Sequence, residues 1–439
     1  DLPPNDGSQL VRMPATPTTT ARLQVRAGGG IFFDLNDADL TILGSVISTG
    51  FNYSCALAAG GTAKCWGANH FGALGTGVSP PALASSDVPV AVAGLTGATA
   101  LTIGTDGRHA CVTIPGGGAK CWGANANGQL GNGTTTDANT PVTVLASLSP
   151  PTPLTGVAPA SVGALAAGGS HTCALTTAGT VKCWGANATG ELGNGTATDA
   201  STPVTVLASL SPPTPLTGIV AVAAGSHHTC ALTTGGTVKC WGLNNGGQLG
   251  TGSSTGPLTC AFDIPCATTP VAVSGLTGVV AISTGSGSSC ALLAAGTVKC
   301  WGNNAFGTIG NGTWADAPTP VAVSGLTGVA AISAGHLNTC ALLATGTAKC
   351  WGHNGSGQLG NGLTCTPYAV PDNCQSNAPV AVVGLSGATA LSTGFTASCA
   401  RLVGGAARCW GLDTDGDLGD GQGGVGSWSN IPVAVLGLP

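Results

Sequence analysis

This chain of 439 residues carries very little charge and lacks any long apolar run. Charged residues make up 7% of the sequence, against about 25% in typical soluble domains. Gly, Thr and Ser interrupt every apolar stretch before it reaches the roughly 18 to 20 residues that a membrane-spanning helix needs, which predicts a soluble protein. With 12 lysines and arginines and a net charge of -5, the chain has no basic patch that would neutralise a run of phosphates, so nucleic-acid binding is not expected.

Signatures of catalysis are also missing. The chain holds a single glutamate, Glu191. No set of serine, histidine and aspartate, no phosphate-binding loop and no histidine-rich metal motif stands out. The sequence therefore predicts a protein that is not an enzyme and that needs no cofactor.

Cysteine, in contrast, is abundant. Eighteen cysteines would be a heavy load of free thiols in the cytosol, whereas an even number at regular spacing suits an oxidising compartment. No targeting segment is visible, and the polar start Asp1–Asp6 is what removal of a signal peptide would leave. The expected location is extracellular or at a cell surface.

A repeat runs through nearly the whole chain. The string Cys-Ala-Leu, followed ten residues later by Cys-Trp-Gly, occurs seven times with small variations, and successive copies start 50 to 62 residues apart. Such a period is typical of propellers and solenoids. Short segments rich in β-formers, such as Pro320–Val323, alternate with glycine-bearing turns, and helix-length periodic segments are absent. The pattern predicts an all-β architecture of small four-stranded sheets repeated radially.

The spacing within each repeat predicts a disulfide. A glycine stands six residues after each first cysteine, at Gly61, Gly117, Gly179, Gly236, Gly296, Gly346 and Gly405. A three-residue hairpin loop ending in a glycine bulge would place the two cysteines of a unit opposite each other, where they can bond without moving the backbone. We predict seven intra-blade disulfides, each worth about 2 to 3 kcal/mol; pairing between neighbouring blades is the alternative. The predicted pairs are Cys55 and Cys65, Cys111 and Cys121, Cys173 and Cys183, Cys230 and Cys240, Cys290 and Cys300, Cys340 and Cys350, Cys399 and Cys409.

Two further cysteine pairs occupy one common slot in their units. Cys260 with Cys266 and Cys365 with Cys374 lie between the Leu-Gly-x-Gly turn and the next Pro-Val-Ala-Val strand. No histidine clusters beside them, and the spacings do not match zinc sites. Local disulfides that pin two long loops are therefore favoured over a metal site.

The repeat motif also resembles a known family. Gly168–Leu175 with Gly179–Gly195, and Gly225–Leu232 with Gly236–Gly252, follow the pattern of the regulator-of-chromosome-condensation repeat, here in a cysteine-bearing secreted bacterial style. The match covers about residues 41–439. The resemblance implies a seven-bladed β-propeller whose ring is closed by joining the N- and C-terminal segments, with Pro432–Leu438 as the first part of a unit that continues in Leu40–Gly50.

Residues outside the regular repeat suggest two additional features. Residues 1–40 lie before the propeller of residues 41–439 and are interpreted as a linker, a stalk or an assembly strand. Units two and three share a nearly identical proline-rich stretch at residues 140–156 and 202–218. Because these stretches belong to neighbouring blades, we expect them to project side by side.

One acidic run departs from the repeat and suggests a cation site. Asp413, Asp415 and Asp417 lie in a segment that resembles an oxygen-rich Ca²⁺ loop, although the Gly and Glu expected at later EF-hand positions are missing. A second acidic group, Asp34, Asp37 and Asp39, precedes the first unit, and ring closure could bring the two groups together. The alternative interpretation is a set of surface acids in a turn.

Three repeated residue types invite functional hypotheses, each with a structural alternative. The basic residue before each second cysteine would form a ring that attracts an anion, or would simply face solvent. The tryptophan after each second cysteine is interpreted as blade packing. The histidines just before the first cysteines are interpreted as structural, and because they lie on different blades they cannot converge on one metal ion. The basic residues are Lys64, Lys120, Lys182, Lys239, Lys299, Lys349 and Arg408, and the histidines are His109, His171, His228 and His336.

The preferred functional hypothesis is an extracellular or cell-surface binding or structural module. It would recognise a protein or an extracellular polymer through irregular blade loops at residues 78–88, 146–156, 208–218, 253–269 and 363–377. One alternative is a self-assembling subunit of a surface layer or filament that uses residues 1–40. Another is a secreted enzyme inhibitor. The chromatin role of the family's founding member is not expected, because of the disulfides and the acidic balance.

Overall fold

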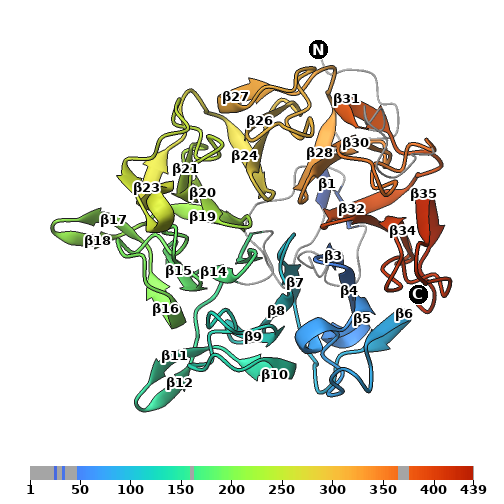
Figure 1. Cartoon of the computed structure of the whole chain (residues 1–439), viewed down its shortest axis with the longest axis horizontal. Coiled ribbons are helices and arrows are strands. Elements are labelled where there is room, and N and C mark those ends of the chain that lie inside the picture. Colours follow the sequence, from blue (N-terminus) through green and yellow to red (C-terminus); the bar gives the residue numbers. More distant parts are fainter. Residues whose placement is uncertain (1–23, 27–31, 35–46, 159–162, 364–374, 439) are drawn as a thin grey trace. The chain divides into compact units, whose positions relative to one another are not determined.

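The computed structural model describes residues 24–26, 32–34, 47–158, 163–363 and 375–438. The chain divides into two compact units, Asp1–Leu43 and Gly44–Pro439. In the first unit, β1 (Gln24–Arg26) and β2 (Phe32–Asp34) form an antiparallel pair. The second unit is a seven-bladed β-propeller, as predicted (Figure 1).

Each blade is an antiparallel sheet with four strands that run in chain order from the central axis to the rim, and the fourth blade carries one additional short strand at its outer edge. Blade 1 contains β3 (Ile47–Thr49), β4 (Tyr53–Ala58), β5 (Thr62–Ala68) and β6 (Ser85–Ala91). Blade 2 contains β7 (Ala100–Ile103), β8 (His109–Ile114), β9 (Gly118–Gly123) and β10 (Ala138–Thr143). Blade 3 contains β13 (Leu165–Ala167), β14 (His171–Leu175), β15 (Val181–Gly185) and β16 (Ala200–Thr205).

The second half of the ring repeats this arrangement. Blade 4 contains β19 (Ile219–Ala224), β20 (His228–Thr233), β21 (Val238–Leu243), β23 (Pro265–Ala272) and a short outer strand, β22 (Leu258–Thr259). Blade 5 contains β24 (Val279–Thr284), β25 (Ser288–Leu293), β26 (Val298–Gly302) and β27 (Ala317–Ala322). Blade 6 contains β28 (Val329–Ala334), β29 (Asn338–Leu343), β30 (Ala348–Gly352) and β31 (Ser376–Ala381). Blade 7 contains β32 (Ala388–Thr393), β33 (Ala397–Leu402), β34 (Ala407–Leu412) and β35 (Trp428–Ala434).

The central hairpin of every blade has the predicted register. Cys55 of β4 lies opposite Cys65 of β5, and the other six units pair in the same way. The glycine six residues after each first cysteine has φ between 68° and 95°, a conformation that side chains other than glycine rarely adopt. All seven intra-blade disulfides are present, with Cα–Cα distances of 4.0 to 4.1 Å. The prediction of seven intra-blade disulfides is therefore confirmed, and the alternative of pairing between blades is wrong.

The hydrophobic core lies between the blades. In each cluster, the disulfide and the leucines of one blade contact the tryptophan of the next, as Cys173 and Cys183 contact Trp241. All seven of these tryptophans are 0% exposed, and each indole N–H donates to a backbone carbonyl of the preceding blade at 2.8 to 3.0 Å. The interpretation of these tryptophans as blade packing fits this arrangement, which leaves no indole face for a ligand.

The ring closes where the first blade meets the last. Thr49 N donates to Ser392 Oγ at 2.9 Å, and Trp66 Nε1 donates to the Asp417 carbonyl at 3.0 Å. The boundaries of the structural blades differ from those of the sequence repeat. Pro432–Leu438 contributes to the outer strand β35 of blade 7 and not to blade 1. All four strands of blade 1 come from residues 47–91. The two chain ends therefore close the ring by packing blade on blade.

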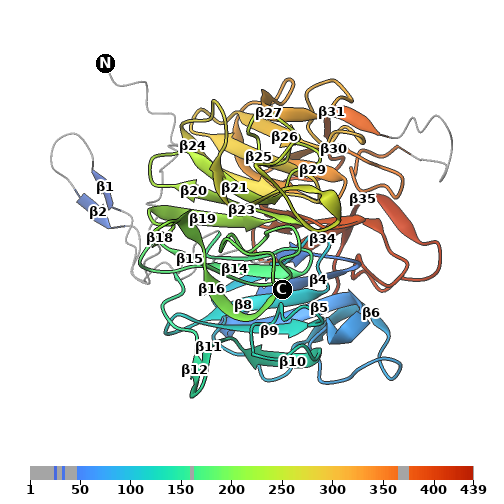
Figure 2. The ribbon, with the colours of Figure 1, turned by 60° about the vertical axis from the view of Figure 1, so that its left-hand side comes forward.

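The proline-rich stretches form two exposed hairpins outside the blades. They comprise β11 (Leu145–Leu148) with β12 (Pro151–Pro153), and β17 (Leu207–Leu210) with β18 (Pro213–Pro215). Figures 1 and 2 show them at separate places on the rim. β11 contacts β16 and β17 contacts β23, the outer strands of the following blades. The expectation that the two stretches lie side by side is wrong, because each packs against the blade after its own.

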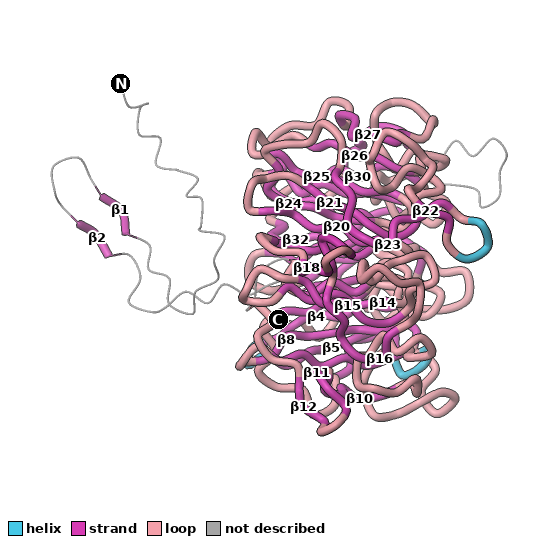
Figure 3. Tube along the Cα trace, turned by 90° about the vertical axis from the view of Figure 1, so that its left-hand side faces the viewer, coloured by secondary structure: helices cyan, strands magenta, loops and turns pink. Residues whose placement is uncertain are grey.

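Helices are scarce in the part of the chain that the structure describes. Three single-turn 3-10 helices, η1 (Ala59–Gly61), η2 (His70–Gly72) and η3 (Ala261–Asp263), are the only helices in the described residues (Figure 3). A disulfide joins Cys260 and Cys266 beside η3. Cys365 and Cys374, and the acids Asp37 and Asp39, lie outside the described residues. No helix within the described ranges is long and apolar enough to cross a membrane.

Candidate functional site

Seven short loops surround one end of the central channel. They join the first strand of each blade to the second, and we call them the mouth loops: residues 50–52, 104–108, 168–170, 225–227, 285–287, 335–337 and 394–396. Backbone hydrogen bonds link successive loops, as from Phe51 N to Gly107 O at 3.2 Å and from Phe395 N to Gly50 O at 3.1 Å. The loops therefore form a connected rim that rests on the rigid blades.

The channel below this rim is narrow and uncharged. Its cavity of about 260 Å³ is lined by the innermost strands of all seven blades. Hydroxyls on these strands accept backbone N–H groups of the following blade, such as Ser48 Oγ from Ile103 N and Ser283 Oγ from Ala334 N, each at 2.9 Å. Because these hydroxyls serve contacts between blades, the charged groups of interest lie at the mouth.

The mouth loop of blade 2 is two residues longer than the others. Four residues separate Gly104 from His109, whereas two separate Gly168 from His171. The extra length carries Asp106 across the channel. Asp106 accepts hydrogen bonds from Ser226 Oγ of blade 4, from Ser286 of blade 5 and from His336 Nδ1 of blade 6.

Asp106 is negatively charged at neutral pH. Burial alone would raise the pKa of its carboxyl, but the hydrogen bond and charge of His336, together with the two serine hydroxyls, hold that pKa below its ordinary value. Its partners are separated from it by 120 residues or more in the chain, and the repeat pattern contains no sign of the contact. His336 was predicted to be structural, and no feature considered in the sequence pointed to Asp106.

A second carboxylate and histidine pair lies at the mouth between blades 3 and 4. Glu191 Oε1 lies 3.5 Å from His227 Nδ1, and Thr189 N donates to Glu191 Oε2 at 2.9 Å. Burial would raise the pKa of Glu191, but the hydrogen bond with His227 and the other favourable contacts of the carboxylate, including that with Thr189, together hold this pKa below its ordinary value. The hydrogen bond with Glu191 also raises the pKa of His227. The only glutamate of the chain is therefore part of the mouth.

Beside Asp106, the mouth opens into a pocket of about 410 Å³, which we call the mouth pocket. It is lined by residues of blades 1, 2, 3, 6 and 7, among them Phe51, Phe71, Arg108, Asp137 and Phe395. The guanidinium carbon of Arg108 lies 4.3 Å from the ring centroid of Phe51 and 5.6 Å from that of Phe71. Charge and aromatic rings, both scarce in this chain, thus meet at one place.

The aromatic side of the pocket continues to His336. The rings of Phe51 and Phe395 lie 4.5 Å apart, and those of Phe395 and His336 lie 4.1 Å apart. His336 therefore connects the aromatic cluster to Asp106. Ser226 donates to the carboxylate and not to a histidine, so this group lacks the order of contacts that activates a serine nucleophile. The arrangement is suited to binding.

Three of the four predicted structural histidines lie buried between blades, each directly after a mouth loop. Each Nε2 lies 2.9 Å from a hydroxyl of the next blade, in the pairs His109 with Thr172, His171 with Thr229 and His228 with Ser289. Each hydroxyl donates to a backbone carbonyl of the preceding blade. The hydroxyl oxygen must therefore accept from the histidine, which fixes Nε2 as the protonated nitrogen.

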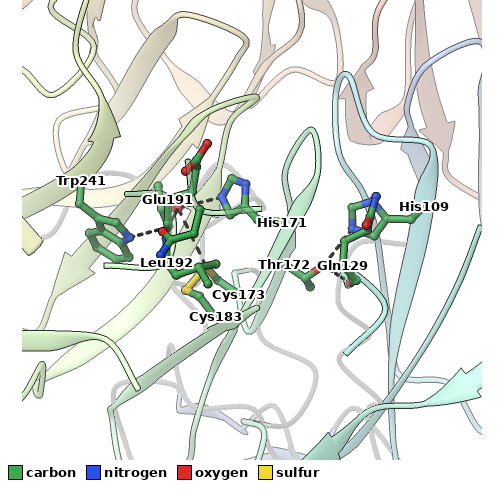
Figure 4. The surroundings of a disulfide bond; sticks show 11 residues. His109, Gln129, His171, Thr172, Cys173, Cys183, Glu191, Leu192 and Trp241 are labelled. Carbon is green, nitrogen blue, oxygen red and sulfur yellow. Dashed lines mark hydrogen bonds between the residues drawn. A yellow bond between two sulfur atoms is a disulfide. The ribbon is translucent and has the colours of Figure 1, made fainter. Parts of the chain in front are cut away.

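These histidines, which we call the histidine belt, are neutral at neutral pH. Burial lowers their pKa values to about 3 for His109, about 4 for His171 and about 3 for His228. Figure 4 shows His109 beside Thr172 and Gln129, and His171 nearer the disulfide Cys173–Cys183. Their role is to join blades.

Among the proposed calcium residues, Asp413 occupies a position that holds asparagine in the other six blades, and Asp417 one that holds glutamine in three of them. Leu418 N donates to Asp413 Oδ1 at 2.9 Å, as Leu130 N does to Asn125 Oδ1. Burial raises the pKa of Asp413 to about 6, and burial with the neighbouring acids Asp415 and Asp413 raises that of Asp417 well above its ordinary value. Neither carboxylate oxygen of Asp417 has a hydrogen-bond partner.

Within the described ranges, no three His, Cys, Asp or Glu side chains are grouped in a way that would hold a metal ion. The calcium hypothesis for Asp413, Asp415 and Asp417 therefore gains no support from the geometry.

The repeated basic residues do not line the channel or the mouth pocket. They lie on the third strands, where they are half-buried. Lys64 Nζ donates to the Gly437 carbonyl at 2.7 Å, and Arg408 donates to the Pro432 carbonyl at 3.3 Å. Lys64 thus contacts the C-terminal segment, and Arg408 contacts the neighbouring strand β35. That the seven basic residues form a ring that attracts an anion stays a hypothesis.

Known proteins share both the repeat and the fold. The chain is 31% identical over 272 residues to the human E3 ubiquitin-protein ligase HERC2, which is 61% of this chain and 5% of that protein. It is 31% identical over 211 residues to the ultraviolet-B receptor UVR8 of Arabidopsis thaliana, which is 48% of this chain and 44% of the receptor. This chain therefore spans less than half the length of these relatives.

Solved structures agree on the propeller. The yeast RCC1 protein Prp20, solved bound to Kap60, superposes with a TM-score of 0.68 at 19% identity, covering 94% of this chain and 91% of that one. Human WBSCR16 superposes with a TM-score of 0.63 at 20% identity, covering 84% and 92%. The RCC1 repeat profile matches residues 46–73, and the RCC1-like domain profile matches residues 147–435. Since that match covers more than half of its length, the chain belongs to the RCC1-like domain family.

Proposed function

We propose that this protein is a binding module that works outside the cell or at its surface and recognises a partner protein through the mouth loops. The observation that carries the proposal is the mouth itself. Asp106, Arg108 and His336 gather there with Phe51 and Phe395, in a chain with 7% charged and 4% aromatic residues. Groups of this kind on loops held by a rigid scaffold are typical of recognition sites.

Two further observations support the proposal. Structures of the yeast relative show it bound to Kap60 and describe its binding to Gsp1p and histones, so a propeller of this fold serves protein recognition there. In the present chain, the described cysteines are all paired in disulfides, which persist in oxidising compartments. Disulfide pairing favours the extracellular location.

Photocrosslinking from the mouth tests the proposal. A p-benzoylphenylalanine placed at Phe71, whose side chain is 44% exposed, is expected to give a discrete protein adduct in the extracellular fraction of the source cells. The matched control carries the same group at Trp314, which is 48% exposed in the loop between β26 and β27, away from the mouth pocket. Equal adducts from both positions, or an adduct from position 314 alone, would contradict recognition through the mouth.

A further inference from the structure

Arg108 is a cation without a counter-ion. No described residue forms an ion pair with it or accepts a hydrogen bond from its guanidinium, although the group is half-buried in the mouth pocket. The rings of Phe51 and Phe71 contact it. Stacking against aromatic rings holds a guanidinium in place and leaves its N–H edges free to bind an anion.

The acids around the pocket are already occupied by the protein. Asp106 is bound by Ser226, Ser286 and His336. Asp137 Oδ1 accepts a hydrogen bond from Asn125 N at 2.8 Å. Arg108 is thus the charged group of the pocket that has no polar partner among the described residues. Because two carboxylates lie nearby, a singly charged anion fits better than a doubly charged phosphate.

Apolar surface borders this cation. Three of the seven phenylalanines of the chain, Phe51, Phe71 and Phe395, line the pocket. Phe71 is 44% exposed and presents apolar surface beside the guanidinium. A ligand that fills the pocket must therefore carry an apolar group next to its anion.

The backbone N–H groups of the pocket bear on whether it binds a terminal carboxylate or a side-chain carboxylate. The terminal carboxylates of peptides are commonly captured by free backbone N–H groups. In the pocket, Phe51 N is bonded to Gly107 O and Gly169 N to Gly225 O, both at 3.2 Å, so these amides are taken. The guanidinium fork, in contrast, has no protein partner and matches the geometry of a side-chain carboxylate.

From these contacts we infer that the mouth pocket receives an acidic side chain, flanked by an aromatic one, from the partner protein, with Arg108 as the receptor of the carboxylate. The inference rests on the proposed function and specifies its chemistry. Arg108 binds the carboxylate, while Phe71 and Phe395 cover the adjacent apolar side chain. Asp106 and His336 hold the neighbouring loops in position.

Peptide probes test this inference directly. The probe is acetyl-(4-fluoro-Phe)-Glu-Ala-amide, and its counterpart carries Gln in place of Glu; binding is measured from the ¹⁹F line width during titration with the intact protein. The Glu peptide is expected to bind at least tenfold more tightly than the Gln peptide. Arg108→Gln is expected to remove that difference without weakening the Gln peptide. Phe71→Ala is expected to weaken both peptides.

Controls separate this result from misfolding and from failure of the proposed function. Lys120→Gln removes the same charge from the same blade outside the pocket, and it is expected to keep the Glu preference. Unfolding curves verify that each variant is folded. Equal binding of the two peptides, no binding at about 10 mM, or tighter binding of a peptide with a free terminal carboxylate would overturn the inference. A mouth adduct from the photocrosslinking experiment would then still support recognition by another chemistry.

Discussion

At the scale of single residues, one position of the repeat holds different residue types in different blades. The slot of the histidine belt holds His228 in blade 4 and Asn338 in blade 6, and both bond to a hydroxyl of the next blade. Asn338 Nδ2 reaches Ser398 Oγ at 3.2 Å without a titratable group. The chain itself therefore offers a substitution that keeps the bond and removes the proton equilibrium.

This substitution leads to a prediction about acid stability. In the folded protein the belt histidines have pKa values of about 3 to 4, whereas in an unfolded chain the value is about 6.5. Between these values the unfolded state binds more protons, so folding free energy is lost as pH falls from about 6.5 toward 4. The variant His109→Asn, His171→Asn, His228→Asn is expected to lose less stability than wild type over this window.

Urea unfolding at pH 7.5, 6 and 5 measures the difference between the two proteins. Asp413, whose raised pKa of about 6 has the opposite effect on stability, is present in both and cancels in the comparison. Parallel stability profiles for wild type and the triple variant would show that the belt does not titrate as described.

At the scale of elements, the hairpin of the second and third strands is the unit that repeats. Its glycine, its two facing cysteines and its tryptophan are all local in sequence, and a register shift at the tryptophan occurs where the third strand pairs with the fourth in every blade. The disulfide therefore joins two cysteines that already lie opposite each other in the hairpin. Both cysteines are buried in the core between blades.

Removing one of these disulfides should weaken the whole propeller. The variant Cys111→Ala, Cys121→Ala is expected to lose about 2 to 3 kcal/mol of unfolding free energy, because the closed loop is released in the unfolded chain. The variant Cys260→Ala, Cys266→Ala is expected to lose less, since the bond pins a surface loop that can open locally. Denaturant unfolding of both variants checks this order, and an equal loss would contradict it.

At the scale of the molecule, the propeller is one ring and residues 1–43 are a separate unit. A monomeric binding module does not need the N-terminal extension, whereas a self-assembling subunit would. We expect the full-length chain and a chain lacking residues 1–40 to have monomeric native masses by mass photometry. A larger native mass that only the full-length chain shows would favour the assembly hypothesis over the proposed function.

What the sequence determined by itself is local or repeated. Blade number, hairpin register and the seven disulfides follow from spacings of ten residues or fewer, repeated seven times. They were predictable because strand pairing within a hairpin depends on nearby residues and turn chemistry. Two of the irregular loops that appeared best suited for specificity, residues 146–156 and 208–218, form exposed hairpins on the rim.

Which residues meet at the mouth was decided only by the tertiary structure. Asp106 and His336 lie 230 residues apart, and Arg108 meets Phe51 from another blade. Nothing in the repeat marks these residues except a mouth loop two residues longer than its counterparts. Closing seven blades into a ring brings distant loops to one end of the axis, and only that geometry places a charged, aromatic pocket in a chain otherwise poor in both kinds of residue.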